Sequence, residues 1–346
     1  MKSLFLAAFL LVSMQSTVNA APGDDVYTRP GKLVAANGTR LNIYCMGSGS
    51  PTVVFDSGWE DWAPAWAVVQ PRVAKWTRAC SYDRAGAGFS DAGPMPRTSM
   101  RIAEELHSAL HNNGINGPYI LVGGAFGGDN IRAFADLYTM DVAGLVFVES
   151  DAVDFEPADM QALDHQGEAE IVSDLRACRD AVAAGKPLPP LPSGPGESTR
   201  TCAQQFFRGL PEVSWSPELN AKLLQIAQTK VAMYDAYISE MEQMASDEDY
   251  LKQHRQSLGS RPLRVLSTGN HGVGSLATKR PTSLKHLRYE YQTTLAQSRL
   301  LELSSNAKQI FTKNSSEYIQ FDEPDTVTDA IRDVYDQSSK ARGSAR

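Results

Sequence analysis

The sequence lacks several features that would assign it to a function class at once. It has no Cys-x-x-Cys pair, no cluster of lysine and arginine residues and no apolar run long enough to span a bilayer comfortably. Its 40 acidic and 33 basic residues give a formal net charge of −7. Nucleic acid and anionic membrane surfaces are therefore poor candidate partners, because both attract basic patches.

The bulk composition is that of an ordinary globular protein. Of the 346 residues, 42% are hydrophobic and 21% are charged. This length is enough for one large α/β domain or for two average domains, each with a buried core.

The first twenty residues have the three parts of a secretory signal peptide. Lys2 supplies a positive charge, Leu4 to Val12 form an apolar region, and Val18-Asn19-Ala20 is a small-residue cleavage site. We expect a mature chain that begins near Ala21 and is exported to the periplasm or beyond. No integral membrane segment is expected after the signal is removed.

The expected export makes disulfides between the four cysteines plausible, because exported proteins can keep disulfides. Cys45 and Cys80 lie in two expected strands, and Cys178 and Cys202 bracket a loop rich in proline and glycine. We expect the pairs Cys45–Cys80 and Cys178–Cys202. The alternative is four buried free thiols.

Two histidines have the spacing of metal ligands. His107 and His111 lie four residues apart, which places both on one helical face, but the glutamate of an H-E-x-x-H motif is absent. We interpret the two as solvated or structurally bonded, and we expect neither a metal nor a cofactor.

Periodicity predicts an α/β architecture. KLVAANGTRLNIYCM, residues 32–46, is typical of a β-hairpin around Asn37-Gly38. Short apolar runs then alternate with helical patterns at 100–111 and 127–138, which predicts a doubly wound, mostly parallel sheet. The runs are PTVVFDSG, TRACSYDRAG, PYILVGGA and AGLVFVES.

The composition changes after residue 151. Residues 152–261 are rich in Gln, Glu, Ala and Met, with expected helices at 159–184 and 217–246 around a proline-rich loop. The sheet resumes with PLRVLS, and a helix at 284–304, the strand AKQIFTK, a last helix at 324–337 and frayed final residues follow. The expected division is a signal peptide at 1–20, a core at 21–151 and 262–340, and a helical lid at 152–261.

The segment Gly123-Gly124-Ala125-Phe126-Gly127 has the frame of a G-x-S-x-G nucleophile elbow, with alanine at the serine's place. GSGSPTVVFDSG and CSYDRAGAGFSD precede it, and VFVES and EYIQFDEPDTVTDAI follow it. With these motifs in this order, nearly all of the mature chain resembles the α/β-hydrolase superfamily, specifically its esterase-like members. The resemblance implies the α/β-hydrolase fold with a helical lid inserted into it.

The resemblance also implies positions for a catalytic triad. The nucleophile falls on Ala125, the acid on Glu149 with Asp151 as an alternative, and the histidine on Glu317. The last histidine of the chain is His286, so restoring a serine would not rebuild the triad. We interpret both replacements as a natural departure from acyl-enzyme chemistry.

Other groups of the expected pocket remain able to act. Glu317 and Glu149 are expected at its mouth, where two close carboxylates raise the pKa of one of them. His271 is a candidate general acid or base, with a surface-loop histidine as the alternative.

The expected substrate contacts come mainly from backbone amides. Those near Gly58 and Trp59, together with the amide of Phe126, are candidate donors to a carbonyl or enolate oxygen beside Ala125. At Gly124 relatives often carry histidine, so the glycine is a candidate opening for a bulkier ligand.

Three neighbouring features are interpreted as structural. Glu60 and Asp61 are taken as solvated loop charges, and Asp83-Arg84 as a charge pair that braces the loop after its strand. The tryptophans Trp59, Trp62 and Trp66 are taken as pocket wall and core.

Three functions are compatible with these residues. The first is an exported enzyme that isomerises, eliminates, cyclises or decarboxylates a small hydrophobic carbonyl compound by acid/base chemistry without a covalent intermediate. The second is a carboxylic-ester hydrolase, either inactivated or water-activating. The third is a binding protein without catalysis. The fold supports all three equally, because function is determined by the site.

Overall fold

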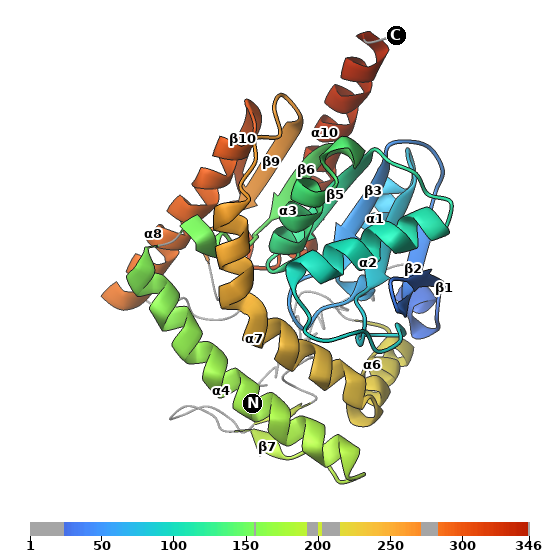
Figure 1. Ribbon diagram of the computed structural model, residues 1–346, viewed down its shortest axis with the longest axis vertical. Helices are drawn as coiled ribbons and strands as arrows, with labels where there is room; N and C mark the ends of the chain where they lie inside the picture. Colours follow the sequence, from blue (N-terminus) through green and yellow to red (C-terminus); the bar gives the residue numbers. More distant parts are fainter. Residues whose placement is uncertain (1–23, 156, 192–199, 203–214, 271–282, 345–346) are drawn as a thin grey trace, which may run out of the picture.

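Figure 1 presents the computed structural model, which describes residues 24–155, 157–191, 200–202, 215–270 and 283–344. The predicted signal peptide and His271 lie outside these residues. No helix within the described part of the chain is long and apolar enough to cross a membrane.

An eight-stranded sheet organises the fold, in the order β1-β2-β4-β3-β5-β6-β9-β10. β2 pairs antiparallel with β1 and β4, and the other neighbours are parallel, which confirms the predicted mostly parallel sheet. The strands are β1 (Lys32–Ala36), β2 (Thr39–Met46), β3 (Thr52–Asp56), β4 (Ala79–Asp83), β5 (Tyr119–Gly124), β6 (Val142–Val148), β9 (Pro262–Ser267) and β10 (Asn306–Phe311).

The predicted hairpin and both predicted disulfides are present. Asn37 and Gly38 have φ of 35° and 90°, the left-handed backbone that a two-residue hairpin turn requires. Cys45 of β2 lies directly opposite Cys80 of β4, and the two form a disulfide. The second disulfide joins Cys178 to Cys202.

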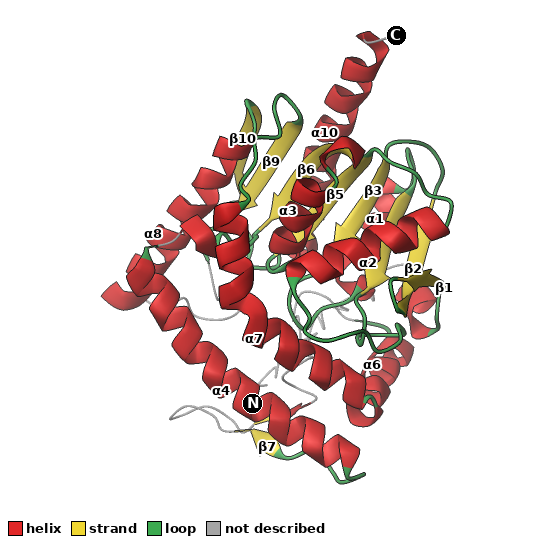
Figure 2. Cartoon of the chain, in the orientation of Figure 1, coloured by secondary structure: helices red, strands yellow, loops and turns green. Residues whose placement is uncertain are grey.

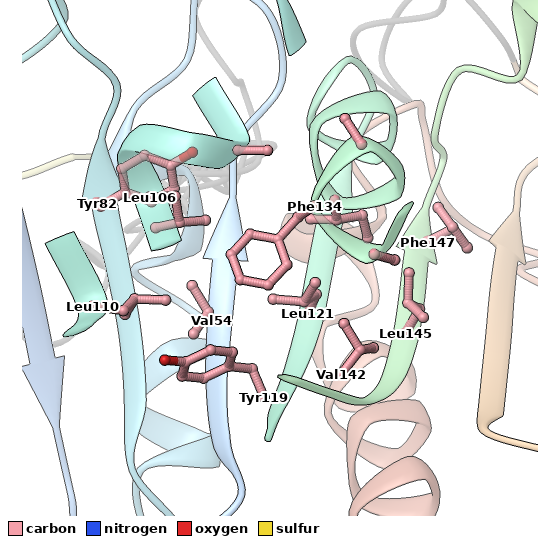
Figure 3. Close-up of a cluster of buried hydrophobic side chains, with 14 of the residues drawn as sticks. Val54, Tyr82, Leu106, Leu110, Tyr119, Leu121, Phe134, Val142, Leu145 and Phe147 are labelled. Carbon is pink, nitrogen blue, oxygen red and sulfur yellow. The ribbon is translucent and has the colours of Figure 1, made fainter. Parts of the chain in front are cut away.

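Helices cover both faces of the sheet, as Figure 2 shows. One face packs against α2 (Ser99–Asn112), α3 (Gly127–Leu137) and α8 (Leu284–Arg299), and the other against α1 (Gln70–Val73) and α10 (Pro324–Ser344). On the first face, Leu106 of α2 and Phe134 of α3 meet Val54 and Leu121 of the sheet (Figure 3). Every residue of β3, β4 and β5 is buried, which explains their continuous apolar sequences.

Among the residues that the structure describes, three α-helices lie between β6 and β9: α4 (Ala158–Ala183), α6 (Pro217–Thr229) and α7 (Val231–Gln253). They lie together at one end of the sheet (Figure 1) and share a core that includes Leu175, Leu223 and Tyr234. The short strands β7 (Pro190–Leu191) and β8 (Arg200–Thr201) pair beside them, and α9 (Ile319–Asp322) follows β10. Short 3-10 helices occupy Asp24–Thr28, Ala63–Trp66, Thr139–Asp141, Val153–Phe155 and Leu300–Leu303.

Two helix predictions are wrong in detail. The stretch 217–246 is two helices, because Lys230 leaves the helical backbone and its Nζ donates to the carbonyls of Ala87, Gly88 and Ser90 at 3.2, 2.7 and 2.6 Å. The last helix continues to Ser344 instead of fraying after residue 337.

One histidine of the HSALH pair is bonded structurally, as interpreted. The Nε2 atom of His107 lies 2.8 Å from Oδ2 of Asp141, and its ring stacks on Tyr138 at 3.7 Å. Within the described residues, no group of three or more His, Cys, Asp or Glu side chains is arranged to hold a metal ion.

The turn from β5 into α3 is a tight one that requires glycine at both ends. A Cβ atom on Gly123 would lie 2.5 Å from the carbonyl oxygen of Gly127, and one on Gly127 would lie 2.5 Å from that of Asp56. Between them Ala125 has φ of 44°, a left-handed conformation that alanine seldom adopts. The chain therefore keeps the elbow backbone with a methyl group at its apex.

Gly127→Ala is expected to lower the free energy of unfolding by about 2–3 kcal/mol, because its methyl group would overlap the backbone of β3. Gly167→Ala is the matched control. It lies within α4 with no atom within 4 Å of the added methyl, so the same change should stabilise by about 0.5–1 kcal/mol. Urea denaturation of both variants measures the difference, and equal effects would contradict this account of the elbow.

Candidate active site

The loops after the parallel strands are joined to one another by backbone hydrogen bonds. The N–H of Ala125 donates to Val148 at 3.3 Å, and the N–H of Glu149 donates to Leu266 at 2.9 Å. The N–H of Asp151 returns to the carbonyl of Ala125 at 3.3 Å. The ends of β5, β6 and β9 therefore form one connected edge, the place where ligands bind in open α/β sheets.

Ala125 is the one residue of 121–130 that is not buried. The other residues of this stretch are buried, whereas Ala125 keeps some exposed surface. Ala125 therefore borders open space at the turn between β5 and α3.

A β-turn brings Asp61 to this space. The N–H of Asp61 donates to the carbonyl of Gly58 at 3.2 Å, and Glu60 has φ of 65°, as the third residue of a type II turn requires. The position that a Cβ atom on Gly58 would take lies 3.3 Å from Oδ2 of Asp61 and 3.4 Å from Cβ of Ala125. The Asp61 carboxyl group and the Ala125 methyl group thus border the same small volume beside Gly58.

The environment of Asp61 favours its protonated form. Burial raises the pKa of Asp61 to about 7, although the positive charge of Arg84 opposes the rise. The negative charge of Glu317 raises that pKa further. The interpretation of Asp61 as a solvated loop charge is therefore wrong, because the type II turn directs its carboxyl group inward.

The loop that carries Glu317 is held at several points. The Oγ1 of Thr268 and the Nδ2 of Asn270 donate hydrogen bonds to the carbonyl of Ser315 at 2.9 and 2.7 Å. The N–H and Oγ of Ser316 donate to Asp322 at 2.7 and 2.6 Å. Glu317 follows this anchored pair, half-buried, near enough to Asp61 for its charge to act there.

The carboxylate of Glu149 is held by hydrogen bonds at the end of β6. Its carboxylate accepts from the N–H of Thr268 at 2.7 Å and from Nε2 of Gln297 at 3.4 Å, and the residue is 7% exposed. This carboxylate therefore links the ends of β6 and β9 to α8. The negative charge of Glu317 acts on Asp61, whose pKa is raised, and the pairing of Glu317 with Glu149 stays a prediction.

The other predicted site residues lie around the elbow. Burial raises the pKa of Asp129 at the start of α3, and the negative charge of Asp151 adds to this rise. A Cβ atom on Gly124 would lie 3.4 Å from the ring of Trp66, in van der Waals contact with it. The role of Gly124 as an opening for a bulkier ligand stays a prediction. Trp66 and Trp62 are buried core residues, and Trp59 is half-buried.

Phe126 is buried, and its ring lies 5.5 Å from the guanidinium carbon of Arg84. Within the described residues, the amides of Gly58, Trp59 and Phe126 have no hydrogen-bond acceptor. All three predicted donors therefore retain the capacity to bind an oxygen atom.

Arg84 braces the loop after β3, although Asp83 is not its partner. Asp83 accepts hydrogen bonds from Asn42 and from the backbone of Phe89, both at 2.8 Å. Arg84 instead forms ion pairs with Asp56 at 3.0 Å and with Glu240 of α7 at 2.9 Å. Asp83 therefore braces the loop after its own strand, β4, as predicted, but Arg84 braces the loop after β3 and the predicted pairing of the two charges is wrong.

Comparison with curated proteins yields partial matches. No family model matches the chain. YbdG of Bacillus subtilis, an uncharacterized protein, is 29% identical over 121 residues, which is 34% of this chain and 37% of YbdG. YqjL of the same organism, also uncharacterized, is 25% identical over 293 residues, or 84% of this chain and 85% of YqjL. An AB hydrolase superfamily protein of Gibberella zeae is 32% identical over 104 residues, or 29% of this chain and 32% of that protein. The chain thus spans well under half of YbdG and of the Gibberella protein.

Solved structures match nearly the whole chain at low identity. A putative acyltransferase from Salmonella enterica has a TM-score of 0.65 at 16% identity and covers 89% of this chain and 95% of its own. A putative epoxide hydrolase from Pseudomonas aeruginosa has a TM-score of 0.60 at 15% identity and covers 90% of this chain and 96% of its own. An esterase from Thermogutta terrifontis has a TM-score of 0.56 at 17%, covering 89% and 98%. The chain has the α/β-hydrolase fold.

The pH dependence of stability tests the environment of Asp61. Its pKa is about 7 in the folded protein and about 3.9 in an unfolded chain, so the folded state binds the proton more tightly. The resulting stabilisation is complete below about pH 4 and is lost as the pH rises to about 7. Asp61→Asn cannot ionise, so it should gain about 1–3 kcal/mol relative to wild type between these pH values.

Urea denaturation at a series of pH values measures this gain. Asp25→Asn, at an exposed carboxyl group, is the matched control and should follow the wild-type curve. Parallel curves for wild type and Asp61→Asn would show that Asp61 is an ordinary solvated carboxylate.

Proposed function

We propose that the protein is an exported enzyme that transfers protons on a small, largely apolar carbonyl compound without forming a covalent intermediate. Asp61 and Glu317 are its acid/base pair, and the amides of Gly58, Trp59 and Phe126 hold the carbonyl oxygen. The observation that carries this proposal is the position of the Asp61 carboxyl group, beside Ala125 and within the electrostatic influence of Glu317.

Acyl-enzyme chemistry is the alternative that the fold first suggests, and the residues argue against it. A methyl group at position 125 cannot attack a carbonyl carbon. The residue at the place of the family's histidine is Glu317, whose usual pKa of about 4.3 makes it a poor base for a serine hydroxyl. We infer that both positions have departed from the triad.

Proton transfer needs one group that accepts a proton and one that donates a proton. Two close carboxyl groups do not ionise together easily, so one carries the proton while the other remains charged. In this proposal Glu317 removes a proton next to the substrate carbonyl, and Asp61 delivers one to the same substrate. An acid with a pKa near the working pH is the best compromise between being protonated and being able to donate.

The developing charge on the carbonyl oxygen also needs stabilisation. Amides that have no other acceptor meet this need without reorganisation, because their direction is fixed by the elbow and by the turn at Gly58. The same arrangement supports isomerisation, elimination, cyclisation or decarboxylation, since each passes through an enolate or a related anion.

The helices within 152–261 serve as a lid in this proposal. Nε1 of Trp59 donates to the carbonyl of Tyr237 in α7 at 3.1 Å, and the Tyr237 hydroxyl donates to the carbonyl of Glu60 at 3.1 Å. These two hydrogen bonds hold the aromatic side chains of Trp59 and Tyr237 against the turn that contains Asp61. An aromatic lining favours an apolar substrate and keeps water from the carboxyl pair.

The remaining predicted residues have supporting roles in the proposal. Glu149 fixes the strand ends, and Asp151 belongs to the elbow by its backbone. His271 remains a candidate acid or base that the described residues do not test. The two disulfides support export, which places the reaction outside the cytoplasm.

Ester hydrolysis by a water molecule is the second candidate, with Glu317 as the base. It is favoured by the esterase and the epoxide hydrolase among the structures of similar fold. It shares the carboxyl pair with the first candidate and differs in its product, which gains the mass of water.

Loss of either carboxyl group is expected to lower turnover by about 10²–10⁴-fold, the usual contribution of a general acid or base. Purified wild type, Asp61→Asn and Glu317→Gln would be incubated with small-molecule extract of the producing organism and followed by mass spectrometry. An ion that wild type consumes should persist with both variants, replaced in the wild-type sample by a product of equal mass or of mass reduced by water or carbon dioxide.

Glu302→Gln, at an exposed carboxylate in the 3-10 helix that follows α8, is the control and should behave as wild type. A compound that co-purifies unchanged with all four proteins would identify a carrier and would refute the enzyme. A product heavier by water would select the hydrolytic candidate.

Ala125→Ser is expected to remain unreactive toward a fluorophosphonate probe, because Glu317 stands where the resemblance places the histidine that would remove the serine's proton. Intact-protein mass spectrometry measures the adduct. Rapid stoichiometric labelling of this serine would show that a working base is still present. The site would then be that of a serine hydrolase, which contradicts the proposal.

A further inference from the structure

Arg84 uses every hydrogen-bond donor that it has. Its Nε and Nη2 donate to the two carboxylate oxygens of Glu240 at 2.9 and 3.2 Å, and Nη1 donates to Asp56 at 3.0 Å. The other two N–H groups donate to the carbonyls of Ser57 at 2.7 Å and Gly58 at 2.8 Å. An arginine has five donors, so this side chain, 2% exposed, is fully satisfied.

The two backbone contacts fix the direction of two amides. In a trans peptide unit the C=O and the next N–H point in opposite directions, and neither unit at Gly58 is among the cis bonds of the chain. The carbonyls of Ser57 and Gly58 face Arg84, so the N–H groups of Gly58 and Trp59 point away from it. Gly58 borders Ala125, which places these free donors beside the elbow.

Helix α7 holds the same segment at three points. Glu240 receives two of the five Arg84 donors, and Tyr237, one turn earlier on the same face, bonds to Glu60 and Trp59. Glu240 and Tyr237 are both fully buried. A shift of α7 would therefore remove the Glu240 acceptors from Arg84 and release the turn at the same time.

We propose that Arg84 is a positioning residue that aims the amides of Gly58 and Trp59 at the substrate oxygen, and that Glu240 makes this aim depend on the seating of α7. The inference rests on the proposed function for its catalytic meaning. Arg84 itself touches no reacting atom. When α7 is packed against the turn, the amides of Gly58 and Trp59 point at the substrate oxygen. When α7 moves away from the turn, these amides lose that direction.

Acetate is a probe that tests this aim without any knowledge of the substrate. At pH 6, where Asp61 is largely protonated, its carboxylate should bind between the free amides. In wild type we expect acetate to shift the ¹H–¹⁵N signals of Gly58, Trp59 and Phe126. Arg84→Lys, which keeps the charge and loses the planar fork, should weaken acetate binding about tenfold or more.

Two further variants complete the experiment. Glu240→Gln keeps the size of the side chain at the α7 end of the contact and should also weaken binding about tenfold, which preserves the test if Arg84→Lys does not fold. Arg97→Lys is the matched control, because Arg97 is equally buried and bidentate, to Glu105 at 2.6 Å, in another part of the fold. It should lower stability and leave acetate binding unchanged.

Three results would overturn the inference. They are an absence of acetate-induced shifts at these amides in wild type, wild-type affinity in both Arg84→Lys and Glu240→Gln, and an equal loss of affinity in Arg97→Lys. These outcomes are independent of turnover, so the acid/base proposal can fail while the positioning role stands. Once a substrate is known, the positioning role predicts a fall in kcat of at least tenfold with KM changed by less than about threefold.

Discussion

The arrangement of the candidate active site depends on one buried guanidinium group, that of Arg84. Removing the charge of Arg84 from water is costly, and the cost is offset only because two carboxylates and two carbonyls satisfy all its donors. The carboxylates come from the end of β3 and from α7, and the carbonyls come from the turn after β3. The sheet, the turn and the inserted helices are therefore joined by one side chain, and the environment of Asp61 follows from that junction.

Backbone strain is concentrated at the same place. Among the described residues, four that are not glycine have positive φ, and three of them, Glu60, Ala125 and Glu149, end strands or turns at the carboxyl edge of the sheet. The fourth is Asn37, in a hairpin turn that suits it. Strain of this kind persists where the surrounding structure fixes a geometry that a site needs. The alanine at the elbow thus retains a costly backbone although it has no nucleophile to present.

The sequence alone predicts the architecture well, because local patterns determine it. The Asn37-Gly38 turn, the runs of buried residues and the cysteine positions gave the hairpin, the sheet and both disulfides correctly. Tertiary contacts explain the errors. The helix break at Lys230 comes from carbonyls more than a hundred residues away, and the role of Asp61 depends on a turn with an unusual residue at its third position. The sequence shows that an acidic residue, Asp61, follows Gly58 by three positions. It does not show that the carboxyl group of Asp61 is buried.

The central claim is that Asp61 and Glu317 act as a coupled carboxyl pair. A ¹³C NMR titration of the Asp61 side-chain carboxyl group, in wild type and in Glu317→Gln, tests it most directly. The account predicts a midpoint near pH 7 in wild type and a lower midpoint in the variant, because the negative charge that raises the pKa has been removed. A midpoint near pH 4 in both proteins would contradict the account, since Asp61 would then be fully ionised at neutral pH and unable to donate a proton.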